Sequence, residues 1–442
     1  PKPATTPTTS SLRRGLTMFA LIAAGEGIFL LPFVVARVFR GTLLDVFELT
    51  NMELGTAFSL YGLIAMASYV VGGPLADRFS ARKLMAIALV TTALGGIVYA
   101  GVPDLATLTA LFGFWGLTTI LLFWAALIRA TREWGGDGEQ SRAFGILDGG
   151  RGVLAAAVAA ITSLIFSLLR PADVDSATLP ELQAALVQVI WIMTGVTTAV
   201  AAVVWLLIPD DGAAPSQRSA PKEKLTSAKM LAVLKLPAVW LQAGIVVCAY
   251  VGYKATDDIG LFAEDALDYD RVEAAYLGTL SFWMRPIAAV GAGLLGDRLS
   301  ASRVIIGSFV VLVLGSTAIA LGLLEPGATA VVIVTVAATS AGIFALRGIY
   351  FALFGEAKVP VAVTGTAVGF VSVLGYTPDV FTGPLFGWLL DRSPGALGHQ
   401  HLWGTVAGFG LVGILCTVGF RLVVQPPEDD EPEPAPTGAV EA

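Results

Sequence analysis

Ionisable side chains lie within long apolar stretches of this chain, where each costs at least about 2.5–3.5 kcal/mol to insert at the centre of a membrane helix. Such side chains are tolerated when they point toward one another, toward water or toward a ligand. They therefore predict a polar interior between helices, and they are Glu26, Asp148, Arg151, Lys254, Asp257, Asp258, Arg285, Arg347 and Asp379.

Three of these residues, Arg151, Arg285 and Arg347, could bind an anionic group, because a planar guanidinium donates two parallel hydrogen bonds to a carboxylate or phosphate. We predict that at least one of them binds the substrate. Arg151 could instead pair with Asp148, three residues before it on the same helical face, and Arg347 could pair with an acid of the stretch 362–390. Aromatic residues flank these charges and are candidates to line a pocket, with helix packing or interfacial anchoring as the alternative: Tyr250, Tyr253, Trp283, Tyr350 and Tyr376.

Glu26 is the first candidate to carry a coupled proton. It lies between two glycines with no basic neighbour in the sequence, and a carboxylate in an apolar pocket can bind and release a proton near neutral pH. Asp379, which follows Pro378, and Asp148 are the further candidates. The alternatives are an ion pair with an arginine of another helix for Glu26 and a helix cap for Asp379.

Lys254 and Asp257 are three residues apart, so they share one face of a helix and suit a structural or gating pair. Asp258 points elsewhere and is a candidate partner for Arg37 or Arg40. Ion pairs across the mouth of a cavity break when the mouth opens, which gives an element with two states. We therefore predict that Arg37, Lys254, Asp257 and Asp258 form a gate.

The composition places these residues in a membrane. Hydrophobic residues make up 55% of the 442 residues, charged residues 14%, and the mean hydropathy is +0.77, whereas soluble domains carry about 25% charged residues. Stretches of about 20 apolar residues can cross the bilayer, and they must be helical because lipid offers no partner for a backbone amide. We place twelve such helices at 15–37, 54–74, 84–103, 107–130, 143–169, 182–208, 237–262, 272–295, 304–324, 328–354, 362–390 and 402–424.

The twelve predicted helices divide into two sets of six. The predicted organisation is a tail (1–14), a six-helix bundle (15–208), a central loop (209–236), a second six-helix bundle (237–425) and an acidic tail (426–442). Most of the 27 Lys and Arg residues flank the membrane on the side of both tails, which predicts that both termini are cytoplasmic. The predicted fold is an all-α membrane protein with two pseudo-symmetric bundles and a substrate site between them.

A charged turn occurs twice in the chain. The segments Gly73–Lys83 and Gly293–Arg303 share the pattern G-x-L-x-D-R-x-S-A-x-[KR], each time between two apolar stretches. The glycine that opens each segment would let the next helix come close. The carboxylate would gain from capping backbone amides near a helix end.

These two turns resemble the signature loop between the second and third helices of the major facilitator superfamily and its echo between the eighth and ninth helices. The resemblance implies secondary transporters that rock one half of the molecule against the other. It also implies a conformational latch made of Gly73, Asp77, Arg78, Arg82, Gly293, Asp297, Arg298 and Arg303. The segments Phe123–Gly152 and Leu346–Asp379 resemble a little-characterised bacterial branch. The first is also similar to the organophosphate antiporters, which implies an anionic substrate.

Other kinds of chemistry find little support in the sequence. Cys248 and Cys416 lie in apolar runs, which argues against a disulfide framework or a metal site, and His399 and His401 alone do not make a metal site. The nucleotide-binding pattern G-x-x-x-x-G-K-[ST] does not occur. We therefore predict no catalytic residues, no metal and no cofactor, and a protein that is not an enzyme.

The predicted function is secondary active transport by alternating access, coupled to protons, of a small organic anion such as a carboxylate or phosphate ester. One alternative is a proton-driven exporter of cationic or amphipathic compounds. The alternative of another class is a non-transporting membrane sensor or scaffold. The predicted partners are the solute, protons and the lipid bilayer, with no nucleic acid, and we expect a monomer in the bacterial inner membrane.

Overall fold

The computed structural model describes residues 11–135, 140–169, 178–210, 235–357, 367 and 370–424, apart from some side chains in α4, α8 and α13. The helices of the first half are α1 (Ser11–Gly27), a π-helical segment (Leu30–Val34), α2 (Val35–Val38), α3 (Arg40–Val46), α4 (Asn51–Arg78), α5 (Ala81–Ala100), α6 (Leu105–Gly116), a second π-helical segment (Leu117–Trp124), α7 (Ala125–Gly135), α8 (Gln140–Leu169) and α9 (Leu179–Leu207).

The second half repeats the plan of long helices with one broken helix near its start. Its elements are α11 (Pro237–Ala255), a 3-10 turn (Thr256–Asp258), α12 (Ile259–Leu267), α13 (Arg271–Leu299), α14 (Ala301–Ala320), α15 (Thr329–Ile349), a 3-10 turn (Tyr350–Ala352), α16 (Leu353–Glu356), α18 (Pro378–Arg392) and α19 (Ala396–Val424).

Nine helical stretches of the described residues are long and apolar enough to cross a membrane, and they coincide with nine of the twelve predicted helices. The predicted helices 54–74 and 272–295 fall within α4 and α13, which are 28 and 29 residues long and therefore also able to span about 30 Å of hydrocarbon. The remaining prediction, 362–390, ends within α18, and much of its first part lies outside the described residues. The all-α membrane fold is thus confirmed.

Several helices begin with caps formed by residues that are close together in the sequence. Thr50 and Glu53 form a capping box at the start of α4, and Asp270 accepts hydrogen bonds from the first turn of α13, which satisfies backbone amides that have no partner within the helix. Asp104 accepts a hydrogen bond from the Thr107 amide at 2.9 Å, and these bonds from Thr107 hold the pKa of Asp104 below its ordinary value.

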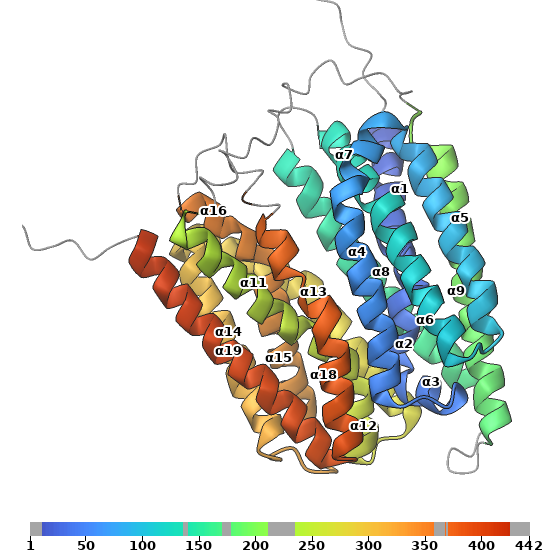
Figure 1. The fold of residues 1–442 in the computed structure, drawn as a ribbon, viewed down its shortest axis with the longest axis vertical. Coiled ribbons are helices and arrows are strands. Elements are labelled where there is room, and N and C mark those ends of the chain that lie inside the picture. Colours follow the sequence, from blue (N-terminus) through green and yellow to red (C-terminus); the bar gives the residue numbers. More distant parts are fainter. Residues whose placement is uncertain are drawn as a thin grey trace, which may run out of the picture.

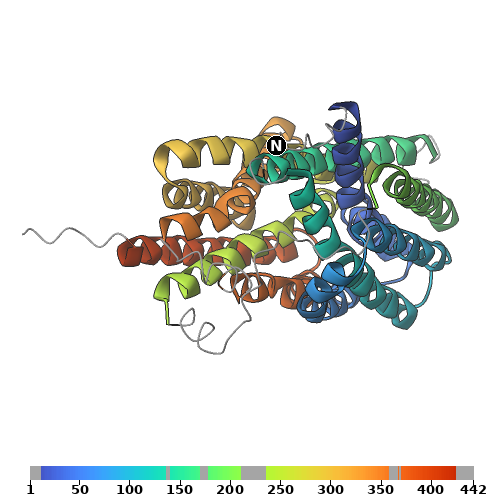
Figure 2. The same ribbon diagram turned by 90° about the horizontal axis from the view of Figure 1, so that it is seen from above.

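The two halves lie side by side, with the blue-to-green helices on one side of Figure 1 and the yellow-to-red helices on the other. The same division is visible from above in Figure 2. The halves meet mainly along two helix pairs, α4 with α18 and α8 with α13, and α2 and α3 add contacts with the second half at one end. We call the end where α1 begins the terminal end (top of Figure 1) and the end that carries α3 and α12 the far end.

Candidate functional site

A cavity of about 270 Å³ lies between the two halves, enclosed by α1, α4 and α8 on one side and α11, α13, α15 and α18 on the other. It is lined by all three candidate arginines, the three candidate carboxylates and the four candidate tyrosines: Arg151, Arg285, Arg347, Glu26, Asp148, Asp379, Tyr250, Tyr253, Tyr350 and Tyr376. Both π-helical segments also contribute lining residues, as such segments often do at functional sites.

Two arginines and two carboxylates form a cluster that crosses the interface between the halves. The Glu26 Oε2 lies 3.5 Å from the Arg151 Nε and 3.5 Å from the Arg285 Nη1. The Asp148 Oδ1 lies 3.6 Å from the Arg151 Nη1 and 3.4 Å from the Arg285 Nη2. These separations exceed the 2.7–2.9 Å or so of a tight charge-assisted hydrogen bond, so the charges are close without being locked together.

The two arginines of this cluster are held differently. Arg151 is buried, and its Nε donates to the Gly25 carbonyl at 3.0 Å. Arg285 belongs to the opposite half and reaches across to Glu26 and Asp148. The Asp148 side chain is 57% exposed, so water reaches this cluster.

Arg347 lies in the cavity among tyrosines. Its guanidinium carbon is 3.7 Å from the centroid of the Tyr253 ring and 5.3 Å from that of Tyr250, which are favourable cation–π distances. The Arg347 Nη1 is buried with no hydrogen-bond partner, and within the described part of the chain we find no carboxylate paired with it. The expected alternative, a pair with an acid of the eleventh predicted helix, is not formed among these residues.

The acid that could have paired with Arg347 is engaged elsewhere. The Asp379 Oδ2 accepts a hydrogen bond from the Tyr250 hydroxyl at 3.0 Å, and its Oδ1 lies 3.7 Å from the Lys254 Nζ. Lys254 also pairs with Asp257 at 3.0 Å. Asp379 therefore has two partners on α11, while Arg347 keeps donors available to the cavity.

Ion pairs between the halves close the far end of the cavity. Arg37 pairs with Asp257, and the Arg40 Nε lies 3.1 Å from the Asp258 Oδ1. All four side chains are buried. These contacts bring together the residues predicted to form a gate, and Asp258 pairs with Arg40 rather than Arg37; the gating role itself stays a prediction.

The helices α4 and α18 approach closely at the same end. A Cβ added to Gly55 would lie 2.2 Å from the Gly383 carbonyl oxygen, and a Cβ added to Gly383 would lie 2.6 Å from the Gly55 carbonyl oxygen. The Asp391 carboxylate accepts hydrogen bonds from the Asn51 and Met52 amides at 3.0 and 2.8 Å. A side chain of the second half thus caps the first turn of α4. We call these contacts the α4–α18 seam.

The repeated turns connect α4 to α5 and α13 to α14 at the terminal end. The side chains of Asp77 and Asp297, and the surroundings of Gly73, lie outside the described residues. Arg78 and Arg298 are exposed, and the Arg303 Nη1 donates to the Leu299 carbonyl at 3.3 Å. A Cβ added to Gly293 would meet nothing within 4 Å. The expected close helix contact at that glycine is therefore absent in this conformation.

One aromatic candidate lies away from the cavity, and two aromatic residues that were not candidates line it. Trp283 is 41% exposed and is not among the residues that line the cavity. Tyr69 and Trp124 do line it, although no charged residue near them in the sequence marks them. The capping role of Asp391 was also missed. In the described part of the chain, no three His, Cys, Asp or Glu side chains gather as they would to bind a metal.

Comparisons with known proteins agree with this architecture. A family model described as Major Facilitator Superfamily matches residues 15–376. The inner membrane protein YqcE of Escherichia coli (strain K12) is 27% identical over 420 residues, covering 93% of this chain and 95% of that protein. The inner membrane protein YihN of the same organism is 25% identical over 409 residues, covering 91% and 94%.

Solved structures show the same fold at low sequence identity. The nucleoside transporter NupG gives a TM-score of 0.71 at 15% identity, covering 93% of this chain and 99% of that one. A bacterial homologue of the human lysosomal transporter Spinster gives a TM-score of 0.68 at 14% identity, covering 94% and 98%.

Proposed function

Because the chain belongs to the major facilitator superfamily and is a transporter rather than an enzyme, we propose that it binds one small organic anion in the central cavity and carries it by alternating access. The observation that carries this proposal is Arg347, a half-buried arginine that lines the cavity and whose Nη1 is buried without a hydrogen-bond partner. A buried donor without an acceptor is unfavourable, and a carboxylate or phosphate of the substrate would supply that acceptor.

The balance of charge in and below the cavity also favours an anion. Six basic residues face five acidic ones, and they are Arg37, Arg40, Arg151, Lys254, Arg285 and Arg347 against Glu26, Asp148, Asp257, Asp258 and Asp379. Each of the five carboxylates lies within 4.0 Å of a basic nitrogen. An organic cation would compete for acids that already have partners, so the exporter of cations is the weaker alternative.

Proton coupling follows from the same cluster in this proposal. A substrate anion that reaches Arg285 competes with Glu26 and Asp148 for its guanidinium. A displaced Glu26 would then be the group able to take up a proton, which makes Glu26 the first candidate and Asp379 the second. Asp379 would act through Lys254, which links it to the ion pairs at the far end.

We further propose that the terminal end faces the cytoplasm, from the excess of Lys and Arg on that side. The far end, closed by the pairs Arg37–Asp257 and Arg40–Asp258, would then face outward. In this arrangement the structure represents the state that faces the cytoplasm, in an inner membrane like that of the E. coli relatives. Breaking the far-end pairs and closing the terminal end would give the opposite state.

A binding screen followed by transport tests the proposal. The unfolding temperature of the purified protein is measured with a panel of carboxylates and phosphate esters and, in parallel, with quaternary ammonium compounds. Compounds that raise the unfolding temperature are then tested for uptake into liposomes with and without a pH gradient. We expect stabilisation by anions. Arg347→Ala should weaken binding by about 30-fold or more, as removal of one partner of a buried charge pair does, whereas Arg303→Ala, an exposed arginine far from the cavity, should not.

Three results would overturn one or the other of two parts of the proposal, the anion site and the proton carrier. Stabilisation by cations alone, or full affinity in Arg347→Ala, would refute the anion site. Uptake in Glu26→Gln that still follows the pH gradient would remove Glu26 as the proton carrier while leaving the anion site intact.

A further inference from the structure

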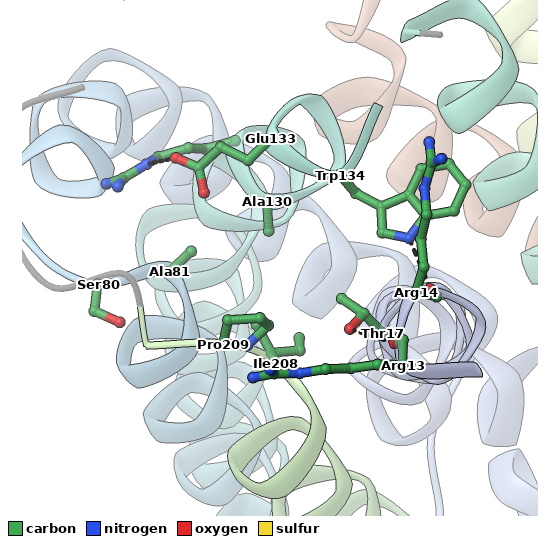
Figure 3. A pocket seen from close by; sticks show the side chains of 11 residues that line it. Arg13, Arg14, Thr17, Ser80, Ala81, Ala130, Glu133, Trp134, Ile208 and Pro209 are labelled. Carbon is green, nitrogen blue, oxygen red and sulfur yellow. Dashed lines mark hydrogen bonds and ion pairs between the residues drawn. The ribbon is translucent and has the colours of Figure 1, made fainter. Parts of the chain in front are cut away.

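A second cavity, of about 210 Å³, lies at the terminal end of the first half, apart from the central cavity. It is enclosed by the start of α1, the turn between α4 and α5, the end of α7 and the end of α9. Figure 3 shows Arg13 extending along Ile208 and Pro209, with Arg14 against the ring of Trp134 on the opposite wall. The Arg14 guanidinium carbon lies 4.5 Å from that ring centroid, and the Trp134 Nε1 donates to the Arg14 carbonyl at 2.8 Å.

The walls of this cavity carry more positive than negative charge. Arg129 lines it and pairs with Glu133 at 2.7 Å, while its Nη1 donates to the Ala76 carbonyl at 2.6 Å. Beside it, a groove that shares Arg13 is lined by Arg82 and Asp210, which pair at 2.5 Å. The basic residues Arg13, Arg14, Arg82, Lys83 and Arg129 thus face the two carboxylates of Glu133 and Asp210.

Arg82 has a donor that the protein does not use. Its Nε is buried and has no hydrogen-bond partner, although its guanidinium lies over the Trp205 ring at 4.9 Å. The Asp210 carboxylate accepts a hydrogen bond from the Nη2. The nearby Ser80 side chain and the Arg82 guanidinium hold the pKa of Asp210 below its ordinary value. Asp210 is therefore ionised at neutral pH, yet it leaves the Nε without an acceptor.

The repeated turn of the second half is followed by a helix whose first turn bonds to a carboxylate. There Ser302, which matches Arg82 in the repeated turn, donates its amide to the Glu356 Oε1 at 2.9 Å in the first turn of α14. In the first half, Ser80 and Ala81 at the start of α5 line the cavity instead, and Ser80 makes no side-chain cap.

The outer wall of the groove is apolar and exposed. Leu206 is 77% exposed, Leu16 40% and Trp205 48%, and Leu16 and Leu206 line the groove next to Arg13 and Arg82. Side chains of this kind lie against acyl chains in a membrane protein. The groove therefore has basic side chains on its inner side and exposed leucines on the side that faces lipid.

We propose that the groove beside this cavity binds the phosphate headgroup of an anionic phospholipid, with Arg13 and Arg82 donating to the phosphate and an acyl chain lying along Leu16 and Leu206. Arginine suits phosphate because its fork of donors matches two phosphate oxygens. The lipid would join the first turn of α1 to α5 and the end of α9. This site is separate from the transport site and does not depend on the transported substrate.

Lipid binding to the full-length protein tests the proposal. Native mass spectrometry and thermal unfolding in detergent are run with phosphatidylglycerol, with phosphatidylcholine and, separately, with glycerol phosphate and inorganic phosphate. We expect phosphatidylglycerol to bind at least tenfold more tightly than phosphatidylcholine and to raise the unfolding temperature. The Arg13→Ala/Arg82→Ala variant should lose this preference, whereas Arg298→Ala/Arg303→Ala, at the matching turn of the second half, should keep it.

Two further variants keep the test decisive if the double substitution fails to fold. Arg13→Gln replaces an exposed side chain by a neutral one of similar length and should weaken phosphatidylglycerol binding severalfold. Leu206→Asp should weaken binding of the lipid without changing any effect of inorganic phosphate. Equal stabilisation by glycerol phosphate and by the lipid, or an unchanged lipid preference in Arg13→Gln and the double variant, would overturn the proposal.

Discussion

Replacing Gly55 by alanine should shift the protein toward the state that is open at the far end. The new Cβ would lie 2.2 Å from the Gly383 carbonyl oxygen, whereas an ordinary contact needs about 3.5 Å, so α4 and α18 would have to separate by about 1.3 Å. The obstructing atom belongs to the backbone and cannot rotate away. Overpacking of this kind costs about 1–3 kcal/mol, and that penalty falls only on the state in which the α4–α18 seam is closed.

A penalty of about 1–3 kcal/mol changes the ratio of two states by about 5- to 150-fold. The far-end distance can be measured by double electron–electron resonance between spin labels on Ala106→Cys and Leu397→Cys, two exposed positions at the far ends of α6 and α19. The native cysteines, Cys248 and Cys416, are replaced by alanine. We expect a longer distance to gain population in Gly55→Ala.

The matched control is Gly195→Ala on α9, where an added Cβ would meet nothing within 4 Å; it should leave the distance distribution unchanged. Gly383→Ala gives an independent test, because its Cβ would lie 2.6 Å from the Gly55 carbonyl oxygen. If both seam variants fold and show the same distribution as the parent, the seam does not hold the far end closed and the reasoning is refuted.

Three further predictions concern the far end. Asp391→Ala removes the cap on the Asn51 and Met52 amides and should destabilise the closed seam by about 0.5–2 kcal/mol. The distance between the two far-end spin labels should then increase. An unchanged distance would show that the cap contributes nothing. Arg40→Ala leaves Asp258 buried without its partner and should lower the free energy of unfolding by about 3–5 kcal/mol. Part of this stability should return when Asp258 is also replaced. Equal losses in the single and double variants would contradict this. Asp104→Ala should lower the unfolding temperature at pH 7 and by less at pH 3. A carboxyl whose pKa is lowered by folding contributes its full stability above the ordinary value near 3.9 and loses it as the pH falls through the pKa of the folded state. A pH-independent difference would argue against the cap.

The helices were predictable because the bilayer leaves few choices. An apolar stretch of sufficient length must be helical in lipid, and caps such as Thr50 with Glu53 are local patterns that sequence reading can find. The pair of Lys254 with Asp257 was predictable for the same reason, since its spacing alone places both side chains on one face.

The site was only partly predictable, because its pairs join distant segments. That Glu26 meets both Arg151 and Arg285 depends on how α1, α8 and α13 pack, and nothing in the local sequence encodes that packing. Asp379 was a candidate partner for Arg347, yet it contacts Lys254 and Tyr250. The sequence identified the charged groups but could not identify which donor was left over.

The contacts at the far end have a consequence for leakage of ions. The Asp391 cap, the glycine contacts of α4 with α18 and the pair of Arg40 with Asp258 all join the same two halves at one end. If each half moves as a unit, these contacts form or break together. A slightly parted mouth would lose hydrogen bonds and buried charge pairs without gaining room for water to replace them. Intermediate widths should therefore be short-lived, and the protein should rarely offer a continuous path along which protons could cross without the solute.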